Sequence, residues 1–173
     1  MEDAEVLARI ALTLAPGVGL QRFRLLLSTF GSAQAAIAAP RANVGASIAH
    51  AERVLAQLRE LGARAVVLGD PDFPPQLEVI TEPPPVLYVW GDLSLCTRPI
   101  VAIVGSRDHT SYGAEAARIL ASAVATRAVV VSGMARGIDA IAHHAALEAG
   151  GRSIGVLGNG FGVVYPKSNA DLY

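Results

Sequence analysis

The chain of 173 residues has a single cysteine, few aromatic residues (5%) and no apolar run long enough to cross a membrane. One cysteine excludes an internal disulfide and a metal site built from cysteines, and Cys96 is expected to be an inert small hydrophobic residue. A membrane helix needs about 20 apolar residues, and the acidic start MEDAEVLARI lacks the basic segment of a signal peptide. We therefore expect a cytoplasmic protein with no membrane contact.

The net charge of −1 provides no overall attraction to nucleic acid, so any such attraction must be local. Residues 1–97 contain seven arginines and ten acidic residues, a net charge of −3, whereas residues 98–173 contain seven basic and five acidic residues, a net charge of +2. The 52% hydrophobic and 17% charged residues are typical of a globular protein. The charge difference favours an anionic ligand on the second half.

The first part of the chain has apolar residues at helical spacing. Helices are predicted over residues 4–15, 20–30, 33–39 and 48–61, with Ser32 capping the third. The turn Pro16-Gly17-Val18-Gly19 makes the first two a helical hairpin. Glycine turns of this kind bind a nucleic-acid backbone in some proteins and only reverse the chain in others; Arg22 and Arg24 slightly favour binding, and both interpretations stay open.

Strands are predicted over residues 63–68 and 86–90, followed by a repeating strand and helix pattern. Residues 100–104 are apolar without alternation, which indicates a central parallel strand covered on both faces. Further strands are expected at 128–131 and 153–157, with helices at 114–125 and 138–149. The fold class is therefore α/β with a Rossmann-like parallel sheet, and the predicted domains are 1–62, all helical, and 63–173.

Each of the last three predicted strands ends in a loop that contains glycine. Right-handed crossovers bring such loops to one edge of a parallel sheet, where backbone N–H groups and helix N-termini favour phosphate. Arg107 and Arg136 add full charges that suit phosphate oxygens. The candidate binding residues are Gly105, Ser106, Arg107, Ser132, Gly133, Arg136, Gly137, Asn159 and Lys167. For Lys167, contact with the anionic ligand and simple solvation are equally open.

Other polar and aromatic residues near these loops have structural interpretations. Thr110 or Ser111 either caps the following helix or contacts phosphate. Asp139 is expected to cap N–H groups at its helix start, with His143 one turn on as its partner or near the pocket rim. His143 and His144 point about 100° apart on a helix and lack a ligand set, so no metal site is expected. No catalytic set is visible.

Aromatic side chains also occur near the end of the chain. Tyr112, Phe161 and Tyr165 are candidates for stacking on bases, a mode that single-strand-binding proteins use. Phe161 and Tyr165 lie among valines, which favours core packing for both.

Several stretches together resemble the DNA-processing protein DprA (Smf) family. They are VAIVGSRDHTSYG (101–113), SGMARGIDAIAHHAALEAGG (132–151) and SIGVLGNGFGVVYP (153–166) with Asn169, together with the earlier DPDFPPQL and PPPVLYVWGDL. The opening APGVGLQRFRLLLSTFGS resembles the family's helical N-terminal domain, which is related to SAM and helix-hairpin-helix modules. The resemblance covers nearly the whole chain in the right order.

The resemblance implies a protein that binds single-stranded DNA in natural transformation and recombination, protects the incoming DNA and loads the RecA recombinase. It implies an extended Rossmann-like domain in which Arg107 and Arg136 contact DNA, a homodimer in the full-length protein, and no cofactor, metal or enzymatic activity. Family members usually continue well beyond the point where this chain ends, so we expect the chain to stop within the Rossmann-like domain.

Two enzyme classes are alternatives. A nicotinamide-dependent oxidoreductase requires G-x-G-x-x-G after the first strand of the sheet, and the sequence from Gly105 to Asp108 lacks it. A nucleotide-binding hydrolase similar to the phosphoribohydrolases shares a related sheet and an SG-containing loop. Its PGG-x-GT-x-x-E signature is absent, although the chain ends before that signature is expected. The helical N-terminal segment and the GSR and GID motifs favour DNA.

Overall fold

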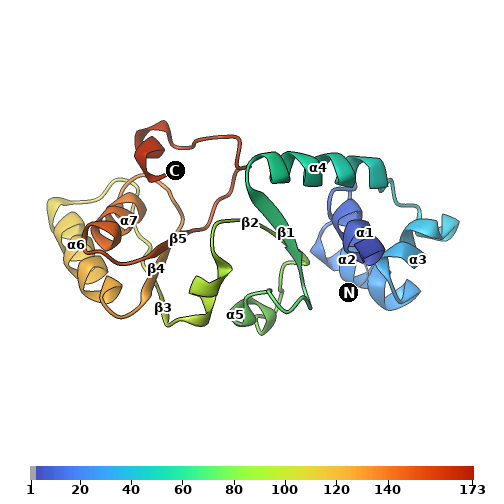
Figure 1. Ribbon diagram of the computed structural model, residues 1–173, viewed down its shortest axis with the longest axis horizontal. Helices are drawn as coiled ribbons and strands as arrows, with labels where there is room; N and C mark the ends of the chain where they lie inside the picture. Colours follow the sequence, from blue (N-terminus) through green and yellow to red (C-terminus); the bar gives the residue numbers. More distant parts are fainter. Residues whose placement is uncertain (1–2) are drawn as a thin grey trace. The chain divides into compact units, whose positions relative to one another are not determined.

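Four helices form where apolar residues recur at helical spacing. In this computed structural model, which describes residues 3–173, they are α1 (Asp3–Thr13), α2 (Leu20–Phe30), α3 (Ala33–Ala38) and α4 (Ile48–Glu60) (Figure 1). A short 3-10 helix, η1 (Pro40–Ala42), follows α3. The Ser32 hydroxyl accepts a hydrogen bond from the Ala35 N–H at 3.0 Å, which confirms the predicted cap. All four predicted helices are confirmed to within two residues at each end.

A partly buried carboxylate connects α1 to α3. Glu5 accepts hydrogen bonds from the N–H groups of Ala33 (2.9 Å) and Gln34 (3.1 Å) at the start of α3, and from Arg9 on its own helix (3.1 Å). Burial by itself would raise the pKa of Glu5, but the two N–H donors and the Arg9 guanidinium outweigh burial and lower the pKa. The negative charge also complements the helix dipole of α3.

The two arginines of the helical hairpin bind carbonyl groups of the chain itself. Arg22 donates to the carbonyl oxygens of Gly17 and Asn43, at 3.3 and 3.0 Å, and Arg24 donates to that of Thr81 at 3.2 Å. Their guanidinium groups therefore hold the hairpin turn and its neighbouring loops in place. The relation of this segment to SAM or helix-hairpin-helix modules stays a prediction.

A two-stranded antiparallel sheet packs against helices of the same unit. Strands β1 (Ala63–Val67) and β2 (Val86–Trp90) pair in the register that places Ala65 opposite Tyr88. Val67 packs in a core with Ile10, Ala11 and Ala51 from α1 and α4. The connection between the strands contains a short helix, α5 (Pro75–Glu78), that the sequence analysis did not predict.

The chain forms two compact units, one ending at Leu93 and the other beginning at Ser94. Both strands of the antiparallel sheet therefore lie in the first unit. The domain boundary inferred after residue 62 rests on the change from helical to strand pattern, and it stays a prediction about folding units. The second unit begins within the 3-10 helix η2 (Leu93–Thr97). Among the described residues, no helix is both long and apolar enough to span a membrane.

The second unit contains a three-stranded parallel sheet. Strands β3 (Ile100–Ala102), β4 (Val129–Ser132) and β5 (Ser153–Gly155) lie in the order β3-β4-β5, connected by α6 (Ser111–Ala125) and α7 (Ile138–Glu148). The 3-10 helix η3 (Lys167–Leu172) ends the chain. Helices α6 and α7 pack side by side, as Figure 1 shows, because two right-handed crossovers in the same direction place both on one face. The predicted α/β class is confirmed.

Small side chains allow α6, α7 and the sheet to approach closely. The core contains Ala121 and Ala125 of α6, Val130 of β4, and three alanines of α7, Ala142, Ala145 and Ala146. A Cβ atom on Gly151, just after α7, would lie 2.6 Å from the Cβ of Ala125. The alanine-rich sequences of both helices thus have a packing role.

The expectation that residues 100–104 form a central strand is wrong for this structure. Among residues 3–173, β3 pairs only with β4 and lies at the sheet edge, with Val101 39% exposed and Val104 75% exposed. The central strand is β4, in which Val129 and Val130 are fully buried. A run of β-branched residues indicates a strand, but the number of its neighbours depends on pairing with segments distant in sequence.

Candidate functional site

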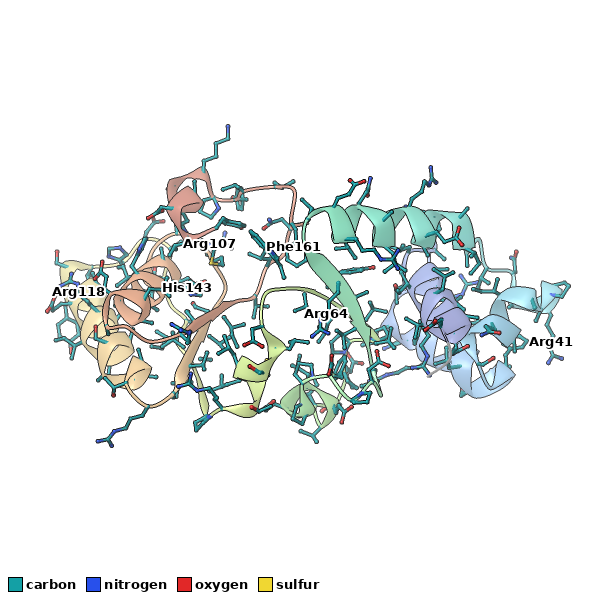
Figure 2. All side chains as sticks on the ribbon, viewed as in Figure 1. Arg41, Arg64, Arg107, Arg118, His143 and Phe161 are labelled. Carbon is teal, nitrogen blue, oxygen red and sulfur yellow. The ribbon has the colours of Figure 1, made fainter. Side chains whose placement is uncertain are left out.

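A pocket of about 280 Å³ lies at the carboxyl ends of the parallel strands. Its lining comes from the loop after β3 (Arg107), the loop after β4 (residues 133–136), the loop after β5 (Gly158 and Asn159) and the segment before η3 (Tyr165 and Pro166). Figure 2 labels Arg107, which lies at this edge of the sheet. The three predicted loops therefore do meet, as parallel strands joined by right-handed crossovers require.

The loops after β3 and β4 are packed tightly together. The Ile138 N–H donates to the Ser106 carbonyl at 3.1 Å. Gly137 has a φ of +86°, and a Cβ atom there would lie only 2.4 Å from the Ser106 carbonyl oxygen. A Cβ on Gly105 would lie 2.8 Å from the Ile138 side chain. Glycine is thus required at both positions for close approach, and at Gly137 also for its backbone conformation.

Two buried polar side chains hold the loop after β4 in place. The Asp139 carboxylate, 8% exposed, accepts hydrogen bonds from the N–H groups of Gly133 (3.2 Å) and Ala135 (3.4 Å). The Asn169 amide, 4% exposed, donates to the carbonyl oxygens of Met134 (3.0 Å) and Ala135 (3.1 Å). Met134 itself has a left-handed φ of 58°. Asp139 therefore has a structural role, but its bonds go to N–H groups of the loop before α7 and not to those at the helix start, where the sequence analysis expected a cap. Asn169 holds the same loop through its carbonyl groups.

The two arginines of the pocket differ in their surroundings. Arg107 and Arg136 both line the pocket and both are exposed. Arg136 also forms an ion pair with Asp108 across the two loops, with 3.1 Å between its Nη2 and a carboxylate oxygen. The site thus presents two guanidinium groups and one carboxylate to a ligand.

His143 lies on α7 (Figure 2) and is 2% exposed. Its Nδ1 is 2.6 Å from the Ser153 hydroxyl oxygen, and that hydroxyl donates its one proton to the Val130 carbonyl at 2.9 Å. The Ser153 oxygen must therefore accept the hydrogen bond, which places the imidazole proton on Nδ1. Burial lowers the pKa of His143, and the nearby Asp139 carboxylate opposes this effect without reversing it.

The lowered pKa of His143 predicts that stability falls on acidification. An unfolded histidine takes up a proton as the pH falls through about 6.5. The folded protein resists this protonation, so below about pH 6.5 the protein takes up a proton when it unfolds. The contribution of His143 to the free energy of unfolding is therefore complete above about pH 6.5, and it is lost as the pH falls toward the pKa of His143 in the folded protein. Urea unfolding at pH 7.5 and pH 5.0 measures this loss, and His143→Gln should remove that part of the pH dependence. His109→Gln, an exposed site, is the matched control.

Four of the nine predicted binding residues line the pocket: Arg107, Gly133, Arg136 and Asn159. Asn159 also donates to the Val163 carbonyl at 2.6 Å, so its amide shapes the loop after β5. Direct contact of any of these residues with a ligand stays a prediction.

The other five predicted residues lie outside the pocket lining. Gly105 and Gly137 serve the close packing of the loops, and the Ser106 hydroxyl binds the backbone of Asp108. Ser132 is 2% exposed, and its hydroxyl donates to the Ile103 carbonyl. Lys167 begins η3 and is exposed. Of the two open roles for Thr110, the structure shows the helix cap, with its hydroxyl accepting from the Gly113 N–H at 3.1 Å.

Sequence reasoning missed part of the lining. Met134, Ala135 and Pro166 also line the pocket, as does Tyr165, which the sequence analysis named as a stacking candidate but assigned to core packing. Tyr165 is 65% exposed, so its predicted core packing is wrong. Its neighbours Val163 and Val164 are themselves exposed, which the apolar sequence does not reveal. The glycine at position 155 is a sequence signal for the place of Met134. A Cβ atom on Gly155 would lie in the space that the Met134 side chain occupies.

Comparison with known families decides the relationship. The sequence profile of the family described as DNA recombination-mediator protein A matches residues 64–173, the whole second unit and the strands before it. The chain belongs to this family. The predicted resemblance is thus confirmed.

Individual curated relatives support this family membership. DNA processing protein DprA of Bacillus subtilis (strain 168) is 38% identical over 122 residues, which are 69% of this chain and 41% of that protein. Protein Smf of Escherichia coli (strain K12) is 46% identical over 101 residues, which are 58% of this chain and 27% of that protein. The chain therefore spans less than half the length of these two curated relatives.

Two solved structures of family members resemble this one. The X-ray structure of DNA processing protein A (DprA) from Streptococcus pneumoniae has a TM-score of 0.73 at 27% identity, covering 99% of this chain and 63% of that chain. A structure of the protein from Helicobacter pylori, described for its unique single-stranded DNA binding mode, has a TM-score of 0.55 at 33% identity, covering 62% of this chain and 49% of that chain. The Rossmann-like α/β fold is thus shared.

Proposed function

We propose that the pocket of the second unit binds single-stranded DNA without a chemical reaction. The observation that carries this proposal is the convergence of Arg107 and Arg136, from two different loops, on one pocket at the carboxyl edge of a parallel sheet. The description of single-stranded DNA binding for the Helicobacter pylori relative supports it.

The chemistry of the pocket fits a phosphate backbone. Guanidinium groups bind phosphate oxygens with charge-assisted hydrogen bonds, and such contacts do not depend on base identity. A pocket of about 280 Å³ is at the small end of ligand sites. It can admit a nucleotide unit of a flexible single strand, whereas a rigid duplex cannot place its backbone between the loops.

The wider functions concern the whole family protein, and we propose them because the chain belongs to this family. They are protection of incoming single strands, loading of the RecA recombinase, and dimerisation, in the cytoplasm. Nucleoside monophosphates are the contrasting ligands, because a hydrolase similar to the phosphoribohydrolases would bind them in an equivalent pocket.

The first experiment follows the fluorescence anisotropy of labelled oligo-dT with the parent chain and with the double variant Arg107→Ala, Arg136→Ala. The parent should bind in a salt-sensitive manner. The double variant should bind at least about tenfold more weakly, and its salt slope should be smaller by about 1.4, since each phosphate contact to a single strand contributes about 0.7. Circular dichroism checks that both proteins are folded.

The matched control is the double variant Arg118→Ala, Arg127→Ala. It removes the same charge from exposed positions of the same unit that lie outside the pocket lining, and it should bind like the parent. An equal loss of affinity in both double variants would mean that the effect comes from net charge alone. Comparable affinity for duplex and single strand would contradict a pocket that selects single strands.

A further inference from the structure

Two chemically different groups of side chains line the pocket of the second unit. One group is the pair of guanidinium groups that the proposed function assigns to phosphate. The other group is mainly apolar and consists of Met134, Ala135, Tyr165 and Pro166. A ligand that complements both groups has an apolar, flat part next to its phosphate, and a nucleotide has such a part in the two faces of its base.

The aromatic surface of the apolar group is Tyr165. This residue is 65% exposed, so most of it takes no part in packing. The sequence analysis named two further candidates for stacking on bases. Phe161 is partly buried and Tyr112 is 84% exposed at the start of α6, and within residues 3–173 neither of them lines the pocket. The structure therefore selects Tyr165 among the three candidates.

Hydrogen bonds hold Tyr165 in a fixed position relative to Arg136. The Tyr165 carbonyl accepts from the Tyr173 hydroxyl at 3.0 Å, and the Pro166 carbonyl accepts from the Asn169 N–H at 3.1 Å. The Asn169 amide in turn holds the loop after β4, which carries Arg136. These bonds use the backbone of residues 165 and 166, so a change of the Tyr165 side chain leaves them in place.

We propose that Tyr165 stacks on one base of a bound single strand and that this contact makes the pocket select single strands over duplex. The inference rests on the proposed single-strand-binding function and assigns its specificity to one residue. Every base has a π-face, so the contact adds affinity without choosing a sequence. In a duplex the neighbouring base pairs cover these faces, and a base reaches Tyr165 only after it has been unstacked and unpaired.

The test compares two labelled strands of equal length and charge, oligo-dT and a strand made of abasic sites, by fluorescence anisotropy. The parent should bind oligo-dT about tenfold more tightly, because one stacked base contributes a factor of this order. Tyr165→Ala should bind both strands alike, whereas Tyr165→Phe keeps the ring and should keep the preference. The matched control is Tyr112→Ala, which removes an exposed tyrosine outside the pocket lining and should also keep the preference.

Salt dependence separates stacking from a charge contact. Tyr165→Ala removes no phosphate contact, so its salt slope with oligo-dT should equal that of the parent, whereas the double variant Arg107→Ala, Arg136→Ala should have a smaller slope. Duplex DNA cannot use the stacking contact. Tyr165→Ala should therefore bind oligo-dT about tenfold more weakly than the parent and should bind duplex with the parent's affinity.

Equal affinity of the parent for oligo-dT and the abasic strand would overturn the role of Tyr165 and leave the proposed DNA function standing. A preference that Tyr165→Ala leaves intact, or an equal loss of duplex affinity in that variant, would overturn it in the same way. A parent that binds neither strand would overturn both proposals. Circular dichroism checks that each variant is folded.

Discussion

Replacement of Gly137 by alanine is expected to lower the free energy of unfolding by about 3 kcal/mol or more. Two effects combine. The residue has a φ of 86° and a ψ of −131°, a conformation that residues with a side chain rarely adopt. A Cβ atom would also lie 2.4 Å from the Ser106 carbonyl oxygen and 2.7 Å from that of Arg107. Both obstacles are backbone atoms, so no side-chain rotation relieves them.

Urea unfolding monitored by circular dichroism measures this loss. Gly162→Ala is the matched control, because no atom lies within 4 Å of a Cβ at that position and its φ is not in the left-handed region. It should change the free energy of unfolding by less than about 0.5 kcal/mol. Equal stability of the two variants would mean that the loops after β3 and β4 are not packed as described.

Asp139→Ala is expected to produce the second large effect, a loss of about 3 kcal/mol. The substitution leaves the N–H groups of Gly133 and Ala135 without their acceptor near a buried site, and hydrogen bonds to a charged group are worth more than neutral ones. It also removes the carboxylate that opposes the low pKa of His143, so that pKa should fall further.

Asp139→Asn keeps the shape and one acceptor oxygen, so it should lose less stability than the alanine variant. Asp171→Ala removes a 66% exposed carboxylate that pairs with His144, and exposed pairs contribute about 1 kcal/mol at most. Unfolding of the three variants in urea gives the order of stability. If Asp139→Ala is as stable as Asp171→Ala, the loop does not depend on the Asp139 hydrogen bonds.

The sequence by itself determined the local elements and the edge at which the site lies. Apolar spacing located α1 to α4, and Ser32 is a cap because its hydroxyl can reach an N–H group only three residues away. The β-branched segments that became β3, β4 and β5 each precede a loop containing glycine. These are short-range properties, and the handedness of crossovers adds the one long-range rule needed to bring the loops together.

Only the tertiary structure decided which side chains face the pocket and which atoms they meet. Tyr165 lines the pocket, Asp108 pairs with Arg136 over 28 positions of sequence, and Asn169 reaches back to Met134 over 35 positions. It also placed β3 at the edge of its sheet. Such contacts depend on the packing of segments distant along the chain, and neither periodicity nor the spacing of motifs contains that information.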